Sequence, residues 1–244
     1  MKDYLNDLIN HTAQLGIIET IKVVGTDQQT VIKANAQDRT VMISGKFKQP
    51  HAEFIGTFGM PNLAKLKTIL GFEEYDEHAT INVTRQDRDE GADIPVAVHF
   101  ETQTGDFIND YRLMTQAIVE ETVKEVKFAG AAWNVEFEPK VAAIQRLAKQ
   151  MGANSEHLTF KTKMDGSDLK IYFGDVSSHS ANFVFEGGLT GTMQRSWAWP
   201  AKQFLSIMLL QGDKKIFISD QGAMKITVDS GLADYEYLLP ATQA

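Results

Sequence analysis

Apolar residues recur at helical spacing in two segments of the chain that resemble each other. Segments 2–15 and 140–151 each carry apolar residues three and four positions apart, and each ends at a glycine, Gly16 or Gly152. This spacing gives a helix one buried face, and a glycine directly after it suits a left-handed C-cap. The pattern therefore predicts two related amphipathic helices, whose terminal glycines are 136 positions apart.

A second pair of helices is predicted directly after prolines. Pro61 precedes an apolar pattern that runs to residue 70, and Pro200 precedes one that runs to residue 210. A proline in the first helical turn loses no hydrogen bond, because its N–H would have no partner within the helix. The two prolines are 139 positions apart, close to the first offset, which indicates two copies of one module. With the prolines aligned, Leu66 falls on Leu205, Ile69 on Met208 and Leu70 on Leu209.

Between these helices, runs of β-branched and aromatic residues alternate with turn residues, which is typical of antiparallel strands. The predicted strands are 20–25, 30–38, 40–48, 54–58, 79–85, 95–102 and 107–115 in the first half, and 131–137, 158–164, 168–175, 181–186, 193–199, 215–220, 223–228 and 232–239 in the second. The predicted fold class is α+β. Its domains are two modules, 1–115 and 131–244, joined by a connector at 116–130, and each module has two helices packed on antiparallel sheet.

Composition limits the class of protein and the cellular location that we expect. The chain has 244 residues, of which 43% are hydrophobic and 23% charged, as in an ordinary globular protein. It has no apolar run long enough to span a bilayer and no signal-peptide core at its start. It also has no cysteine, which excludes disulfides and thiolate metal sites. We expect a cytoplasmic protein with no membrane contact.

Charge is distributed unevenly along the sequence. The net charge of −8 by itself argues against nucleic acid as a partner. The predicted helices, however, carry −1, +2, +3 and +1 in chain order, so together they hold +5 and the rest of the chain holds −13. Positive charge is therefore concentrated on the helices. Their basic residues are Lys2, Lys65, Lys67, Lys140, Arg146, Lys149 and Lys202.

No motif nominates an active site. The sequence lacks a G-x-S-x-G elbow, a Walker loop, a dinucleotide fingerprint and an H-E-x-x-H helix. Its six histidines are scattered, with none at metal-ligand spacing to another. The acidic cluster at 87–93 resembles a calcium loop, but the alternating ligand spacing and the closing Glu are missing. We therefore predict no enzymatic activity, no catalytic residue, no cofactor and no metal site.

Two tandem modules without an active site resemble a DNA sliding clamp. The resemblance is to the polymerase processivity factors of T4-like phages and, through them, to proliferating cell nuclear antigen. It covers nearly the whole chain as a pattern of elements, and it includes the ending at 231–240, GLADYEYLLP, whose aromatic–Leu–x–Pro stretch is characteristic of trimeric clamps. The resemblance implies two tandem DNA-clamp modules per chain and a closed homotrimeric ring. It further implies that the ring encircles duplex DNA in the host cytoplasm, is opened by a clamp loader and tethers a DNA polymerase.

The resemblance also assigns the basic residues to the DNA channel. On the helix at 140–151, Arg146 and Lys149 lie roughly opposite the face predicted to be buried. They would contact phosphates without reading bases. The first helix departs from the family, because its polar side carries acids and amides where basic residues are common. The predicted buried face of the helix at 140–151 is Val141, Ile144, Leu147, Ala148 and Met151, and the polar side of the first helix is Asp3, Asn6, Asp7, Asn10 and His11.

A docking site for partner peptides is implied beneath the connector, near the C-terminus. The matching positions are Val41, Ile43, Ile118, Val119, Tyr237, Leu238, Leu239 and Pro240. Two other classes of function stay open. One is a non-enzymatic two-domain phage structural or assembly protein, and the other is an enzyme with a divergent site among the histidines and acidic loops.

Overall fold

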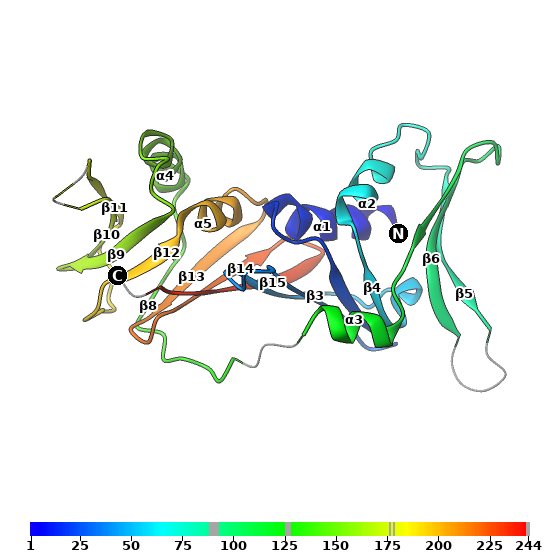
Figure 1. Ribbon diagram of the computed structural model, residues 1–244, viewed down its shortest axis with the longest axis horizontal. Helices are drawn as coiled ribbons and strands as arrows, with labels where there is room; N and C mark the ends of the chain where they lie inside the picture. The colour runs from blue at the N-terminus through cyan, green and yellow to red at the C-terminus, as the bar shows by residue number, and fades with distance from the viewer. Residues whose placement is uncertain (88–92, 125–127, 176, 178, 243–244) are drawn as a thin grey trace. The chain divides into compact units, whose positions relative to one another are not determined.

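The computed structural model describes residues 1–87, 93–124, 128–175, 177 and 179–242 (Figure 1). The chain divides into two compact units, each described here by itself. Unit 1 comprises Met1–Arg39, Ile43–Val126 and Ser230–Tyr235, and unit 2 comprises Thr40–Met42, Lys127–Asp229 and Glu236–Ala244. The predicted α+β class is confirmed. None of the helices in the described ranges combines the length and the apolar character that a membrane crossing requires.

Unit 1 combines helices with two antiparallel sheets. One sheet has the strand order β4-β1-β2-β3 and the other the order β5-β6-β7. Helix α1 packs against α2, and α3 packs against β4 and β1. The helices are α1 (Lys2–His11), η1 (Ala13–Leu15), η2 (Ala52–Phe54), α2 (Leu63–Leu70) and α3 (Gln116–Thr122). The strands are β1 (Ile21–Gly25), β2 (Thr30–Asn35), β3 (Met42–Phe47), β4 (Gly56–Met60), β5 (Thr80–Gln86), β6 (Ile94–Glu101) and β7 (Ile108–Arg112).

Unit 2 repeats this plan. One antiparallel sheet has the order β11-β10-β9-β12, and three further strands pair in the order β14-β13-β8. Helix α4 contacts α5 and β11, while α5 contacts β9 and β12. The helices are α4 (Val141–Ala153) and α5 (Ala201–Met208). The strands are β8 (Val135–Phe137), β9 (Thr159–Asp165), β10 (Asp168–Phe173), β11 (Ala181–Glu186), β12 (Trp197–Pro200), β13 (Asp213–Ser219), β14 (Ala223–Asp229) and β15 (Ala233–Pro240), of which β15 begins in unit 1.

The alternation of apolar residues along the strands places one face of each sheet in a core. In unit 1, every second residue of β2 is buried, including Ile32 and Ala34. In unit 2, Phe160 of β9 lies 5.0 Å from the ring of Phe204 on α5. The Trp199 indole, fully buried, donates a 2.8 Å hydrogen bond to the hydroxyl of Thr162. The helices therefore cover the apolar faces of the sheets with their own apolar sides, and the polar sides of the helices stay exposed.

The repeat of α2 and α5 is real, but the predicted alignment is wrong by one residue. Helix α2 is capped by Asn62, which has a left-handed φ of 51° and accepts a hydrogen bond from the Lys65 amide. Helix α5 is capped by Pro200 itself. The extra capping residue after Pro61 makes the offset between the helices 138. In this register the buried residues Leu63, Leu66, Ile69 and Leu70 match the buried residues Ala201, Phe204, Ile207 and Met208, whereas Leu209 is 63% exposed.

The two predicted glycine caps have different outcomes. Gly16 is left-handed with a φ of 72°, as predicted, but it ends the short helix η1 rather than α1. Helix α1 stops at His11, where the hydroxyl of Thr12 bonds back to the Leu8 carbonyl at 2.6 Å. Gly152 lies inside α4, so the predicted cap there is wrong. The helix continues to Ala153.

Candidate nucleic-acid interface

Helix α4 presents the clearest basic surface. Arg146 and Lys149 lie three residues apart on its exposed face, beside exposed Ala142. Neither side chain makes a hydrogen bond or ion pair with any residue in the described ranges. The opposite face is rotated relative to the prediction, because Ala143 and Leu147 are buried and Val141 is 71% exposed. Arg146 and Lys149 are therefore held out towards solvent as free cations.

Helices α2 and α5 add three exposed lysines. Lys65 and Lys202 have no side-chain partner within the part of the chain that the structure describes. Lys67 donates a 2.8 Å hydrogen bond to the side-chain oxygen of Gln14, so its charge is retained but its position is fixed. We refer to Lys65, Arg146, Lys149 and Lys202 as the free cations.

The two remaining basic candidates have partners within their own units. The Lys2 ammonium donates to the backbone oxygen of Tyr75. The Lys140 ammonium pairs with Oε1 of Glu186, whose side chain is 7% exposed. A contact made by either lysine with a phosphate would have to replace these bonds. In the case of Lys140 it would leave a buried carboxylate without its counter-charge.

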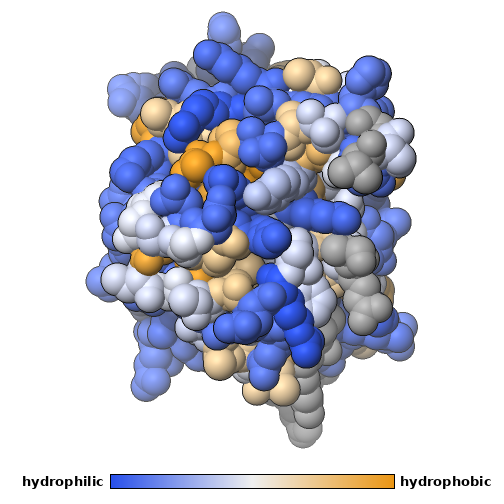
Figure 2. Space-filling view, turned by 90° about the vertical axis from the view of Figure 1, so that its left-hand side faces the viewer, coloured by the Kyte–Doolittle hydropathy of each residue, from blue (hydrophilic) through white to orange (hydrophobic). Residues whose placement is uncertain are grey.

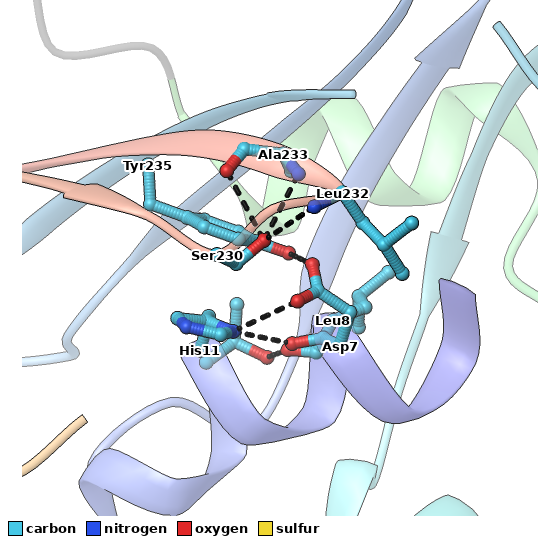
Figure 3. Close-up of polar contacts among 8 residues, drawn as sticks. Asp7, Leu8, His11, Ser230, Leu232, Ala233 and Tyr235 are labelled. Carbon is cyan, nitrogen blue, oxygen red and sulfur yellow. Dashed lines mark hydrogen bonds and ion pairs between the residues drawn. The ribbon is translucent and has the colours of Figure 1, made fainter. Parts of the chain in front are cut away.

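The polar side predicted for α1 contains two residues that are in fact buried, Asp7 and His11 (Figure 3). The Tyr235 hydroxyl donates a 2.8 Å hydrogen bond to Asp7 Oδ2. His11 Nδ1 lies 2.8 Å from the backbone oxygen of Asp7 and 3.3 Å from its Oδ1. The imidazole stacks on the Tyr235 ring at a centroid distance of 4.6 Å. Asp7 is therefore a core residue, and the exposed side of α1 is less acidic than the sequence suggests.

The residues predicted for a partner-peptide pocket differ in exposure. Ile118, at 51%, and Pro240 are exposed, and Leu238 is half-buried. Ile118 and Val119 lie on α3 of unit 1, where Val119 packs onto β4 so closely that a Cβ at Gly59 would lie 2.7 Å from its Cγ2. The five buried residues of the predicted set are Val41, Ile43, Val119, Tyr237 and Leu239.

Unit 2 carries an aromatic surface that the sequence did not predict. Phe128, 41% exposed, stacks on Trp133 at 6.0 Å, and Trp133 lies 6.0 Å from Phe217 of β13. The Lys225 ammonium lies 4.5 Å from the centre of the Phe217 ring and 5.2 Å from that of Trp133. Phe217 and Lys225 are directly opposite across β13 and β14. The sequence feature that could have revealed this surface is the alternation on β13, which turns Phe217 away from the core side of Ile216 and Ile218.

The acidic cluster at 87–93 has its central residues, 88–92, outside the described part of the chain. Among the residues that are described, no group of three or more histidine and carboxylate side chains could hold a metal ion.

The paired helices α1 and α2 in unit 1 and α4 and α5 in unit 2, packed with antiparallel sheets, form the fold of a DNA sliding clamp, and unit 1 has a third helix, α3, within the predicted connector. Among solved structures, the chain is similar to proliferating cell nuclear antigens. It matches the A. fulgidus protein, solved with the C-terminal region of FEN-1 bound, with a TM-score of 0.70 and 11% identity over 100% of this chain and 97% of that one. It matches the Thermococcus kodakaraensis protein with a TM-score of 0.64 and 12% identity over 99% of this chain and 97% of that one. It matches the Entamoeba histolytica protein with a TM-score of 0.66 and 12% identity over 99% of this chain and 94% of that one.

The sequence itself matches no protein-family model and no curated protein. At 11–12% identity, the likeness to the three solved structures establishes the fold. The predicted resemblance to proliferating cell nuclear antigen is confirmed at that level, and the tie to T4-like phages stays a prediction.

Proposed function

We propose that this chain is the protomer of a sliding clamp, a homotrimeric ring that encircles duplex DNA and tethers a DNA polymerase. A separate clamp loader would open the ring, and the protein would act in the cytoplasm without catalysis of its own. The observation that supports the proposal most directly is the clamp fold over the full chain, combined with free cations on its helices.

The free cations suit contact with DNA that carries no sequence information. Arginine and lysine on a solvated helix face attract phosphates at long range, and they exchange one phosphate for the next without reading base edges. The rest of the chain is acidic, which disfavours DNA on other surfaces. Such a charge distribution favours sliding over fixed binding.

Two strand edges could close a ring between copies. Within the described ranges, β7 pairs only with β6 in its sheet, and β11 pairs only with β10. Unpaired edges accept a strand from another chain. Beside β11, α4 carries Val141, 71% exposed, together with the half-buried Ile144, Ala148 and Met151. Figure 2, which views the side on which β11 lies, shows hydrophobic patches within a largely hydrophilic surface. We propose that β11 of one copy pairs with β7 of the next, a head-to-tail contact that closes after three copies.

The polymerase and the loader would dock through short peptides. Of the positions predicted for partner peptides, Ile118 on unit 1 and Leu238 and Pro240 on unit 2 are accessible. The aromatic surface on unit 2 adds rings of the kind that anchor peptides at interfaces. We propose both groups as parts of the partner-binding surface.

The test begins with light scattering behind size exclusion over a dilution series. We expect a mass of about three times 27.2 kDa that falls only on dilution. Retention on closed circular DNA, with loss from the same DNA after linearisation, would then report encirclement.

Charge-reversal variants distinguish two roles of the basic helix residues, namely contact with DNA and simple exposure to solvent. The double variant Arg146→Glu with Lys149→Glu should stay trimeric but lose retention on circular DNA. Lys163→Glu, at an exposed position on β9, is the matched control and should retain it. A monomer at every concentration that neither DNA nor a loader converts to a trimer would refute the clamp. A stable oligomer indifferent to DNA would favour the structural or assembly protein.

A further inference from the structure

A groove in unit 1 is not used by the proposed clamp activity. It has a volume of about 540 Å³ and lies between β4, the start of β6 and the start of α3. We propose that it binds an extended peptide segment of a partner protein through one open strand edge and one cationic side chain, Lys or Arg. The proposal is independent of ring closure and of DNA binding.

The open strand edge belongs to β4. Gly59 exchanges two backbone hydrogen bonds with Met114, of 3.0 and 2.8 Å, on the side of β4 that faces away from β1. Residues two apart on an antiparallel strand direct their N–H and C=O groups to the same side. Thr57, which lines the groove, therefore directs both groups to this edge. Beyond Met114 the chain turns into α3 at Gln116, so no described residue continues the pairing there.

The walls of the groove are preformed. Gly56 has a φ of 111°, and a Cβ added to it would lie 3.3 Å from the ring of Pro95 on the opposite wall. Helix α3 is held in place by Val119, which covers Gly59 of β4. A peptide would therefore find its binding surface already arranged, which reduces the entropic cost of binding.

The charges of the groove favour a cationic occupant. Asp93 and Glu120 are exposed and line it, and no Lys or Arg belongs to the lining. Glu120 Oε1 accepts a 3.0 Å hydrogen bond from the Gln116 side chain and lies 3.6 Å from the Lys22 ammonium, whereas Oε2 has no hydrogen-bond donor in the described ranges. The Arg85 guanidinium, on neighbouring β5, is engaged by the backbone oxygens of Glu53 and Ile55. An extended segment paired at Thr57 could place a guanidinium or an ammonium between the two carboxylates, whereas an acidic peptide or a nucleic acid would be repelled.

The proposal is tested by NMR titration of the full-length, isotope-labelled protein. The probe is acetyl-Val-Arg-Val-amide, compared with its citrulline analogue, which has the same shape without the charge, and with an N-methylated analogue that cannot donate to a strand edge. We expect saturable shifts of the Thr57 and Ala117 amides with the arginine peptide. Binding of each analogue should be about tenfold weaker, because the citrulline analogue loses a charge-assisted contact and the N-methylated analogue loses a backbone hydrogen bond.

Variants of the protein supply the matched comparison. Asp93→Asn, which leaves the Lys22–Glu120 pair intact, should weaken binding of the arginine peptide about tenfold. Glu121→Gln, an exposed neighbour outside the lining, should leave it unchanged. Equal binding of the arginine and citrulline peptides, or no saturable shift of Thr57 at millimolar peptide, would overturn the proposal. Ring mass and DNA retention are measured separately, so failure here would not count against the clamp.

Discussion

The hydrogen bond between Tyr235 and Asp7 gives the sharpest test of how unit 1 is held together. It joins the first helix to the last strand of the chain, 228 positions apart in sequence (Figure 3). We predict that Tyr235→Phe destabilises the protein measurably. The phenylalanine ring can keep the stacking on His11, so the variant removes the hydroxyl alone.

The magnitude follows from burial and charge. Tyr235 is 1% exposed and Asp7 is 9% exposed, so water cannot readily replace the lost donor. A hydrogen bond to a charged group contributes about 1.5–3 kcal/mol, and an acceptor left buried without its donor costs a similar amount. We therefore expect unfolding to require about 1.5–3 kcal/mol less free energy. For a chain of this length, that lowers Tm by about 3–12 °C.

The assay is urea or thermal unfolding at one fixed protomer concentration, because an oligomer gains stability by mass action. Tyr172→Phe is the control, since its hydroxyl makes no hydrogen bond with the described residues. It should change stability by no more than about 0.5 kcal/mol. A double-mutant cycle with Asp7→Ala should show a coupling of at least about 1 kcal/mol. Equal stability of the two tyrosine variants would refute the reasoning.

Two further predictions concern unit 1. Gly45→Ala should destabilise the protein by about 1–3 kcal/mol, because the added Cβ would lie 2.8 Å from the Tyr235 ring, and the same unfolding assay measures it. Hydrogen bonds to Asp110 and, secondarily, Glu101 raise the pKa of His99 above its ordinary value of 6.5. The stabilisation that protonated His99 gives to the folded state should therefore be complete below about pH 6.5, and it should be lost as the pH rises through the raised pKa. Unfolding of His99→Gln and wild type should differ most at low pH, and parallel pH profiles would contradict this.

The sequence predicted the elements well because the signals that define them are local. Periodicity alone located α1, α2, α4 and α5, and alternation located most strands to within a few residues. The predictions were wrong where a single residue changes the alignment or the rotation of a helix. The left-handed Asn62 adds a position before α2 that a comparison of prolines cannot detect. On α4, Val141 is apolar and at helical spacing, yet Ala143 takes the buried position, because packing against α5 and β11 sets the rotation of the helix.

The candidate site was harder to predict because it depends on contacts between distant positions. Because Asp7 and His11 are polar and share one side of α1, the sequence predicts that they lie at the surface. Their burial depends on Tyr235, which no local pattern links to the first helix. The sequence likewise predicts that Lys140 is a free basic residue, because its partner Glu186 is 46 positions away on β11. Polarity predicts exposure only where no distant partner satisfies the group.

These partners change how the basic charge should be counted. Seven basic residues were assigned to DNA from the sequence, but Lys2 and Lys140 already have partners, and Lys67 is bonded to Gln14. The four free cations are those that can exchange counterions for phosphates without breaking a bond of the fold. The slope of log affinity against log salt changes by about 0.9 for each phosphate neutralised. The slope for this protein should therefore correspond to four phosphate contacts per protomer, not seven. Loss of Arg146 should reduce the slope, whereas loss of Lys140 should leave it unchanged.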